Sequence, residues 1–425
     1  RKRQNNKRSN KMATAISTNV LRQKATELVF VDESTSGTLT AAPSGTDSAT
    51  EQTFVLTEAP VWDQQVNTTT FSETGAQLIT QDQATNYLEF ATTSYNFLAK
   101  PDGAGQPAED YLLLKFFGSQ DTSGEYAYYF SNQSETMSAW QLIDTNFMTA
   151  AAGAIFNEMT VSISKDGNLV YNISAMSNRL YYGGQATVAS ISTNDITINT
   201  PSVSGVPGAA AKNLFFANEP IIVYNNSSGA SRGTTSVSSI SGAVVTVASA
   251  PASIDADDVI LPTISTATAS ALSPLSMKNA SVYMAASGTS QASLFASGNK
   301  VTVQSVDISL NRDIQAPGLQ DLTGSVYPSA SYVIGNDIAI TGSFTLNAQP
   351  NQLSAASRFV DNDLMTIGIQ IDDASSHYVR FLMPYCRVTA VTGGDLVATS
   401  TVNFTVVKGA GTTDASRFKL IYDNA

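Results

Sequence analysis

The stretch MTVSISKDGNLVYNISAM (residues 159–176) alternates apolar and polar side chains on both sides of a two-residue turn signal. Val161 and Ile163 alternate with serines before Asp166-Gly167, and a second alternating run follows the turn. A period of two is typical of a β-strand with one buried face, and Asp-Gly is a frequent hairpin turn. The stretch therefore predicts an antiparallel β-hairpin.

The same alternation recurs along the chain, whereas helical periodicity is scarce. Alternating segments occur at 301–310, 338–348 and 397–407, and the best helical candidates are the short segments 107–118 and 351–364. Turn residues separate the alternating segments at short intervals, as in all-β folds. We therefore predict an all-β fold with a few short helices.

Two arrangements of elements each occur twice. Residues 73–103 and 322–352 both contain a Thr-Gly opening, a polar loop, an alternating strand and a Pro-containing break before a short helix. Residues 155–176 and 382–407 both contain a strand, a turn and a second strand. Self-similarity of this kind indicates that one β unit is duplicated.

The duplication divides the chain into four regions. These are a basic N-terminal arm (1–25), a first β domain (26–184), an inserted module with its linker (185–275) and a second β domain (276–425). Residues 214–262 of the module hold four short alternating strands between turns. Closure of a sheet removes its exposed edges, so this pattern favours a small β-barrel.

The composition argues against most enzyme classes. Charged residues make up 14% of the 425 residues, and the chain has one cysteine and one histidine. One cysteine excludes an internal disulfide framework and a multi-cysteine zinc site, and one histidine leaves little room for Ser-His or metal chemistry. We predict that the chain is not an enzyme and takes no cofactor.

Charge is distributed unevenly. The first eleven residues carry six basic side chains and no acidic one, whereas residues 12–425 carry 17 basic and 35 acidic side chains. Tight nucleic-acid binding needs a basic footprint, so a sequence-reading DNA-binding protein is disfavoured. The arm could be a nucleic-acid or partner tail, but it is short, polar and without aromatic residues, which favours a flexible solvated terminus. No apolar run approaches the length of a spanning helix, and no signal peptide follows the basic start, so we expect a soluble, unsecreted chain.

Two regions near the C-terminus have residue types found in catalytic sites. His377, with Asp372 and Asp373 nearby, could belong to a Ser-His-Asp set, but the polar turn around it favours an exposed hairpin residue. Cys386 lies in an alternating strand and is interpreted as a small core residue rather than a nucleophile.

Other motifs also favour structural interpretations. Asp255, Asp257 and Asp258 lack the glycine and distal glutamate of a calcium loop, so a solvated loop is expected. Gly183-Gly184 does not match a nucleotide-binding motif and indicates a turn. The sequence thus predicts no catalytic, cofactor-binding or metal-binding residue.

An aromatic cluster leaves an alternative function open. The segment EYAYYF contains Tyr126, Tyr128, Tyr129 and Phe130. Such rings could stack on a carbohydrate, as in a phage or cell-surface carbohydrate-binding or adhesion protein, and a β-helix hydrolase is a more distant possibility. Their alternation instead favours a strand that packs one face against a core.

In the second domain, residues 303–348 combine several features of one family. Ser309, Asn311 and Asp313 precede a long irregular loop, and ITGSFT (340–345) is the strand that follows it. With these features the chain resembles the tail tube (major tail) proteins of long-tailed bacteriophages, of the type with two tandem tube domains per chain.

The first domain resembles the same family more loosely. Residues 157–163 are similar to a Ser-rich strand of the family, whereas 87–97 lack the Gly-Ser of the matching strand. The resemblance also includes the closing segment 417–425, and it covers both copies but not the basic arm.

The resemblance implies two tube-type β-barrel or sandwich domains and a structural role in the virion. Tube subunits form rings that stack into a channel for double-stranded DNA, assembled in the host cytoplasm. Two domains per chain imply a trimeric, pseudo-sixfold ring; a hexameric ring is the alternative. Expected partners are other copies of the chain, the tail tip or baseplate, the tape measure and head-proximal tail proteins, with no membrane insertion.

Two further expectations concern assembly. Residues 74–86 and 313–335 are predicted to be equivalent long loops that contact neighbouring subunits. The module at about 185–270 is expected to project from the outer wall, because an inward projection would obstruct the channel.

Overall fold

The structure is a computed structural model. It describes residues 26–40, 43–56, 60–74, 79–101, 106–131, 135–143, 147–164, 166–199, 214–267, 272–315, 332–334, 338–347, 361–373, 377–393, 399–409 and 417–423. The chain is mostly β-sheet with two short α-helices in this part, so the predicted all-β class is confirmed.

The first β unit precedes the inserted module. Its elements are β1 (Thr26–Asp32), β2 (Glu51–Leu56), β3 (Val66–Thr74), β4 (Ile79–Leu88), β5 (Ala91–Leu98), α1 (Asp110–Phe117), β6 (Gly118–Asp121), β7 (Tyr126–Phe130), β8 (Met137–Ile143), β9 (Phe147–Ile163), β10 (Val170–Ser177) and β11 (Arg179–Gly183). The predicted hairpin at 159–176 is confirmed, because β9 and β10 pair antiparallel around a turn where Gly167 has φ 93°.

The module and the second unit follow. The module contains β12 (Ala186–Ser192), β13 (Asp195–Asn199), β14 (Pro220–Tyr224), β15 (Ser231–Ser241), β16 (Val244–Val247) and β17 (Val259–Pro262). The second unit contains η2 (Met277–Asn279), β18 (Ala280–Ala286), α2 (Gln291–Leu294), η3 (Ser297–Asn299), β19 (Lys300–Val301), β20 (Val303–Asn311), β21 (Ile314–Gln315), β22 (Val333–Ile334), β23 (Ala339–Asn347), β24 (Leu364–Asp372), β25 (Tyr378–Gly393), β26 (Thr399–Val406) and β27 (Lys419–Tyr422).

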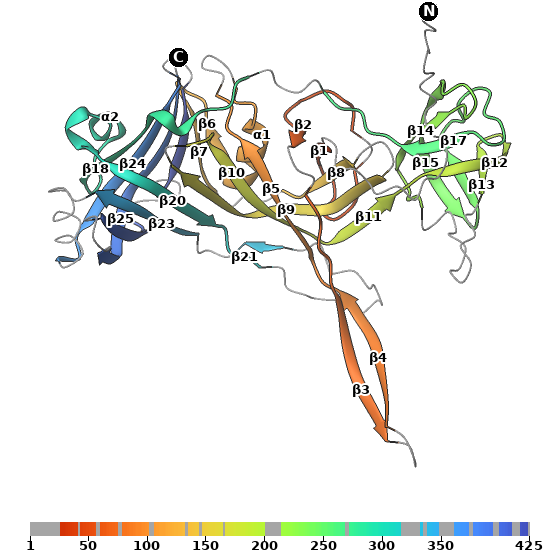
Figure 1. Cartoon of the computed structure of the whole chain (residues 1–425), viewed down its shortest axis with the longest axis horizontal. Coiled ribbons are helices and arrows are strands. Elements are labelled where there is room, and N and C mark those ends of the chain that lie inside the picture. The colour runs from red at the N-terminus through yellow and green to blue at the C-terminus, as the bar shows by residue number, and fades with distance from the viewer. Residues whose placement is uncertain are drawn as a thin grey trace, which may run out of the picture.

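One 17-stranded sheet joins the two units (Figure 1). A first strip runs in the order β5-β10-β9-β20-β23-β26-β25, and every adjacent pair is antiparallel. The long strands β9 and β25 continue into a second layer, which holds β2-β1-β8-β9-β11 in the first unit and β19-β18-β24-β25-β27-β7-β6 across the second. Below, the first strip is called the shared strip and the second layer the outer layer.

A single hydrophobic core runs through both units. Its buried members come from the first unit, such as Phe30 and Phe156, and from the second, such as Phe344 and Phe404. Helix α1 belongs to this core: nearly all of its side chains are buried, and its C-terminus ends at Gly118, which has φ 84° and donates its N–H to the Leu114 carbonyl. The two units therefore form one packed body.

The prediction of helix at 107–118 is confirmed by α1, but the other helical prediction is partly wrong. Most of 351–364 lies outside the described residues; Leu364 begins β24, where it pairs with Arg387. Pairing across the sheet overrides local helical periodicity at this position.

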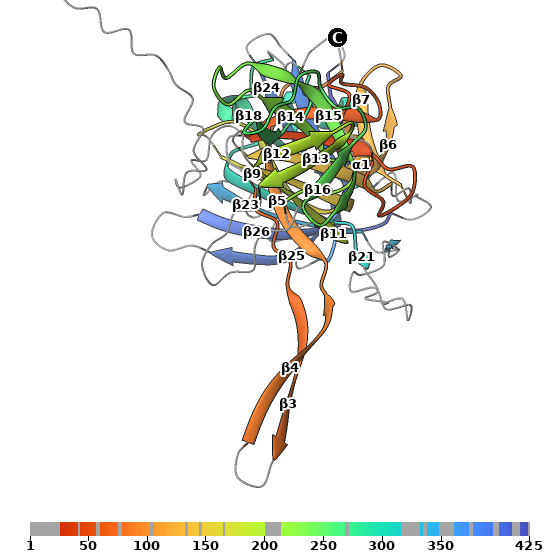
Figure 2. The same cartoon turned by 90° about the vertical axis from the view of Figure 1, so that its right-hand side faces the viewer.

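The inserted module is a closed barrel with its own core (Figure 2). The strand order is β12-β13-β16-β15-β14-β17, so the four strands predicted within 214–262 are joined by two earlier ones. The buried residues of β12 and β13, such as Val188 and Ile196, alternate with exposed or half-buried polar residues.

The predicted long loop at 74–86 is wrong. Strands β3 and β4 pair along their length as an antiparallel hairpin, with one register shift between Asn67 and Thr68, and this hairpin projects from the body (Figures 1 and 2). At 313–335, β21 pairs with β22, and most of the segment between them lies outside the described residues.

Candidate functional site

The duplication is visible in the strand pairing. The corresponding pairs are β1–β2 and β18–β19, β1–β8 and β18–β24, β8–β9 and β24–β25, β9–β10 and β25–β26, β9–β11 and β25–β27, and β5–β10 and β23–β26. Two units with the same pairing can occupy equivalent positions in a larger assembly.

Matching irregularities fix which residues are equivalent. The β9–β10 ladder shifts register next to Glu158, and the β25–β26 ladder shifts next to Ala390. When these shifts are aligned and the pairing is followed across the sheet, Tyr95 in β5 corresponds to Phe344 in β23. Both rings are buried, so equivalent positions have the same role in the core.

The two units meet edge to edge within the shared strip. Residues 158–163 of β9 pair with 306–311 of β20. Side chains reinforce this joint: Ser162 Oγ donates to Asp307 Oδ1 at 2.6 Å, and Ser309 Oγ donates to Glu158 Oε1 at 3.1 Å. The chain thus contains one complete unit-to-unit junction.

A buried arginine fixes the joint from the second unit. The backbone N–H of Arg312 donates to the Asn157 carbonyl at 2.9 Å. Arg312 is 1% exposed, and its guanidinium donates to the carbonyl oxygens of Lys115, Phe116 and Ser131. Burial lowers the pKa of Arg312 to about 10.

One face of the shared strip is lined by short polar side chains. They are Thr92, Ser94, Asn96, Thr160, Ser162, Asn172, Ser174, Asp307, Ser309, Thr341, Ser343, Thr345, Thr401, Asn403 and Thr405, none of them buried. Many of these are cross-strand neighbours, and Asn172 Nδ2 donates to Asn96 Oδ1 at 2.8 Å. Six of the seven strands contain no lysine or arginine; β25 contributes Arg387 to this face.

Each end of the shared strip is incomplete. At one end, an isolated bridge joins Asp63 to Thr92 of β5, so the segment 60–65 corresponds to the C-terminal part of β20. At the other end, residues 390–393 of β25 pair with β26 on one side, and no described strand pairs with their other side. Val61 is 75% exposed although it is a large aliphatic residue.

The side chains around 60–65 support this correspondence. Trp62 and its counterpart Ile308 are both buried. Thr93 Oγ1 donates to the Val61 carbonyl at 3.0 Å, while a Cβ at the corresponding Gly342 would lie 2.7 Å from the Asp307 carbonyl oxygen. The segment 60–65 follows the path of β20, but no described strand pairs with it in the way that β9 pairs with β20.

A buried acidic side chain, Glu109, also forms a contact between the two units. The carboxylate of Glu109 accepts the Lys100 N–H at 3.0 and 3.1 Å and the hydroxyl of Tyr422. The Tyr422 hydroxyl also lies 2.6 Å from that of Tyr171. Burial raises the pKa of Glu109 to about 7, opposed by the Tyr422 and Lys100 hydrogen bonds.

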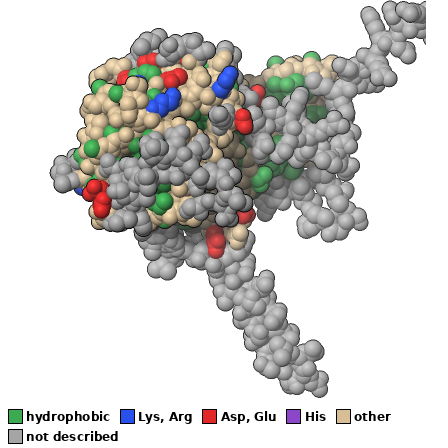
Figure 3. Space-filling model, turned by 60° about the vertical axis from the view of Figure 1, so that its left-hand side comes forward, with side chains coloured by type: hydrophobic (Ala, Val, Ile, Leu, Met, Phe, Trp, Pro, Cys, Tyr) green, Lys and Arg blue, Asp and Glu red, His purple; other side chains and the backbone are tan. Residues whose placement is uncertain are grey.

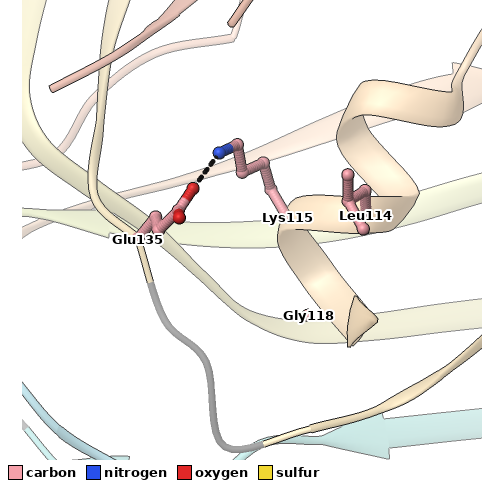
Figure 4. A pocket seen from close by; sticks show the side chains of 4 residues that line it. All are labelled: Leu114, Lys115, Gly118 and Glu135. Carbon is pink, nitrogen blue, oxygen red and sulfur yellow. Dashed lines mark hydrogen bonds and ion pairs between the residues drawn. The ribbon is translucent and has the colours of Figure 1, made fainter. Parts of the chain in front are cut away.

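A small pocket lies at the C-terminal end of α1 (Figure 4). Leu114, Lys115, Gly118 and Glu135 line it. The Lys115 ammonium forms ion pairs with Glu135 and, at 2.8 Å, with Asp32. Because both neighbouring carboxylates neutralise the ammonium, the pocket is a structural ion-pair site rather than a reactive one.

The residues weighed as catalytic have structural partners. His377 Nδ1 lies 2.9 Å from Asp373 Oδ2, and the ring is half-buried rather than exposed as predicted, because this contact holds it over the turn. Asp372 Oδ1 accepts from Gln370 at 2.7 Å. Cys386 is buried, as predicted, and burial raises the pKa of its thiol far above the usual range.

The acidic loop of the module is held by an arginine. Arg232 pairs with Asp255 at 2.9 Å and with Asp258 at 3.1 Å. Asp258 is 2% exposed, so a solvated loop is wrong for this residue: the guanidinium compensates its burial. Asp257 turns the chain with φ 71°.

The aromatic cluster 126–130 forms β7, as its alternation predicted. Tyr128 and Phe130 are buried, and Tyr126 packs against the same core. These rings stabilise the junction with β27 instead of forming an exposed platform.

Among the described residues, no group of three or more His, Cys, Asp or Glu side chains is arranged to hold a metal ion. No helix in the described part is long and apolar enough to cross a membrane. No protein-family model matches the chain, and a comparison with curated proteins gives no match.

Proposed function

We propose that the chain is a structural subunit that associates edge to edge with its own copies into a closed ring, and that stacked rings form a phage tail tube. The observation that carries the proposal is the β9–β20 junction. It joins two equivalent units, while 60–65 and 390–393 offer the same two edges without partners among the described strands. Repetition of one heterologous contact generates a ring when the rotation closes.

The ring contains three chains and six units. Each unit contributes four segments to the shared strip in the same order. In the second unit they are β20, β23, β26 and β25. In the first unit they are 60–65, β5, β10 and β9. A second unit that lay outside the ring wall would not need these four strands. Six chains per ring remain the alternative stoichiometry.

The polar face of the shared strip is the lumen wall. Phosphate groups bind to clustered Lys and Arg, and each such contact increases affinity. This face carries short, mostly uncharged side chains, and the whole chain has a net charge of −12. On the side of the molecule that Figure 3 shows, charged side chains are also few and scattered among the described residues. Such a surface suits transient passage of double-stranded DNA without sequence-specific binding.

Two further kinds of contact join one ring to the next and join the tube to the proteins at the two ends of the tail. The β3–β4 hairpin extends far from the sheet (Figure 2), a suitable position for a contact with an adjacent ring. The chain acts in the virion, after assembly in the host cytoplasm, with tail-tip or baseplate, tape-measure and head-proximal proteins as further partners.

Electron microscopy of the purified chain tests the proposal. Three chains of 44.8 kDa give a ring of about 135 kDa, with true threefold and approximate sixfold symmetry. Hollow rings or tubes with this symmetry support it. Sixfold symmetry between whole chains would overturn the stoichiometry, and dispersed particles under all assembly conditions would overturn the function.

A further inference from the structure

Tyr182 in β11 and Leu420 in β27 occupy equivalent positions. The register irregularity between β8 and β9 ends at Ala151, and the one between β24 and β25 ends at Met383. Tyr182 and Leu420 each pair with the residue two positions before these. The two side chains therefore have the same place in their units.

Their environments differ sharply. Leu420 is fully buried because β7 of the first unit lies beside β27 and brings Tyr128 opposite it. Tyr182 is 50% exposed, and its ring stacks on Phe147 with centroids 6.1 Å apart. The chain itself therefore buries this position in the second unit, whereas the equivalent position in the first unit is half exposed.

The cause is a difference in one connection. Residues 99–136, 38 residues between β5 and β8, hold α1 and the β6–β7 hairpin that extends β27. The corresponding connection between β23 and β24 is residues 348–363, only 16 residues. This connection is less than half as long, and no hairpin equivalent to β6–β7 occurs among the described residues of the second unit.

The barrel module occupies the outer face of the first unit where α2 covers the second. Leu294 of α2 packs on the outer layer with Tyr283 and Leu382. On the first unit, Phe216 of the module packs against Trp140 and Tyr181, with ring centroids 5.9 and 5.3 Å apart.

Helix α2, which covers the outer layer of the second unit, also contacts the first unit. At the junction inside the chain, Gln291 of α2 donates to Glu125 in the β6–β7 turn at 2.7 Å. The module covers the equivalent part of the first unit's outer layer, next to the exposed Tyr182. Figure 1 shows the module and α2 at opposite ends of the long axis, so edge-to-edge association brings the module end of one copy to the α2 end of another.

The module is fixed to β11 rather than tethered loosely. Gly184 donates its N–H to the Leu214 carbonyl at 2.8 Å. The buried Glu219 lies against Gly183 so closely that a Cβ there would be 2.1 Å from Oε1. Ile264 of the return linker belongs to the same buried cluster as Phe216. A rigid module can form a defined contact.

We propose that the barrel module and the Tyr182–Phe147 pair form an outer interface with the second unit of an adjacent copy, replacing the β6–β7 hairpin that closes the junction inside the chain. This rests on the edge-to-edge association proposed above. The partner is a second copy of this chain, and the module is a lateral clamp on the outside of the ring.

Photo-crosslinking tests the identity of the partner. p-Benzoylphenylalanine at position 182 is irradiated in assemblies of mixed ¹⁵N-labelled and unlabelled chains. Mixed-isotope crosslinks to residues 277–423 are expected. Crosslinks that are confined to one chain, or that reach only the first unit of another, would overturn the proposal.

Cysteine labelling separates this proposal from the ring itself. Val391→Cys reports on the shared strip, because Val391 is half-buried while its counterpart Met159 is fully buried at the junction inside the chain. Tyr182→Cys reports on the outer interface, and the native Cys386 is buried. Maleimide labelling of both should slow roughly tenfold or more on assembly, since burial in an interface excludes the reagent. Protection at 391 alone leaves the ring proposal standing and refutes the outer interface. Protection at neither position refutes both.

Discussion

Arg312 Nη1 donates to the carbonyl oxygen of Phe116 at 2.7 Å, across the boundary between the two units. Phe116 lies in the last turn of α1, where carbonyl oxygens have no partner within the helix. The guanidinium therefore satisfies buried acceptors at the negative end of the helix dipole and fixes the second unit to the first.

Arg312→Ala should lower the free energy of unfolding by about 3 kcal/mol, because it leaves buried carbonyls unsatisfied and opens a cavity. Chemical denaturation of the dispersed chain measures the change. Arg387→Ala removes an exposed arginine and should stay within about 0.5 kcal/mol of the native chain. Equal effects of the two substitutions would contradict the role given to Arg312.

Local features of the sequence predicted the local structure. The Asp166-Gly167 turn, the alternation at 338–348 and the apolar segment that forms α1 each depend on neighbours within a few residues. The prediction failed at β3–β4, where a mostly polar sequence lacks the alternation that marks a half-buried strand.

The candidate interface needs the tertiary structure. Arg312 and Phe116 are 196 residues apart in the sequence, and Tyr422 and Glu109 are 313 apart. The exposure of Tyr182 depends on β7, which lies beside β27, while no described strand has the same place beside β11. No local pattern carries this information, although the weak repeat in the sequence did indicate that two comparable units exist.

The raised pKa of Glu109 predicts pH-dependent stability. In the folded chain the pKa is about 7, against an ordinary value of 4.5, so the folded state binds the proton more tightly. Stability is then fully present below pH 4.5 and falls as the pH rises to 7, by about 3 kcal/mol over this window. Glu109→Gln, which stays neutral, should remove this contribution to the slope.

Unfolding midpoints between pH 4.5 and 8 measure the effect. Glu89→Gln is the matched control, because it makes the same change at an exposed position. A Glu109→Gln chain with the same pH slope as the native chain would show that Glu109 does not titrate in this range.

Gly342 is required by the close approach of three strands. A Cβ at this position would lie 2.4 Å from Phe404 Cζ and 2.7 Å from the Asp307 carbonyl oxygen. Gly342→Ala should therefore lower the free energy of unfolding by about 2 kcal/mol through overpacking. Gly298→Ala is the control, since no atom lies within 4 Å of its added Cβ. Similar unfolding midpoints for the two variants would mean that the strands adjust without cost.

The junction between chains should reproduce the register of the junction inside the chain. Ser309 lies opposite Thr160 in the β20–β9 pair. Asp63 corresponds to Ser309 because their partners Thr92 and Thr341 are equivalent, and Thr392 corresponds to Thr160. Asp63 of one chain is therefore expected opposite Thr392 of the next.

An engineered disulfide tests this register. Opposed residues on antiparallel strands have Cβ atoms about 4.5 to 5.5 Å apart, near the separation that a disulfide needs. Oxidised assemblies of the Asp63→Cys, Thr392→Cys chain should give covalent multimers of up to three chains on a non-reducing denaturing gel. The Thr160→Cys, Ser309→Cys chain is the positive control, because the same geometry there closes within one chain. Asp63→Cys with Thr389→Cys shifts one partner three residues along β25, about 10 Å, and should remain monomeric. If the positive control closes and the Asp63–Thr392 pair does not, the chains do not join in this register.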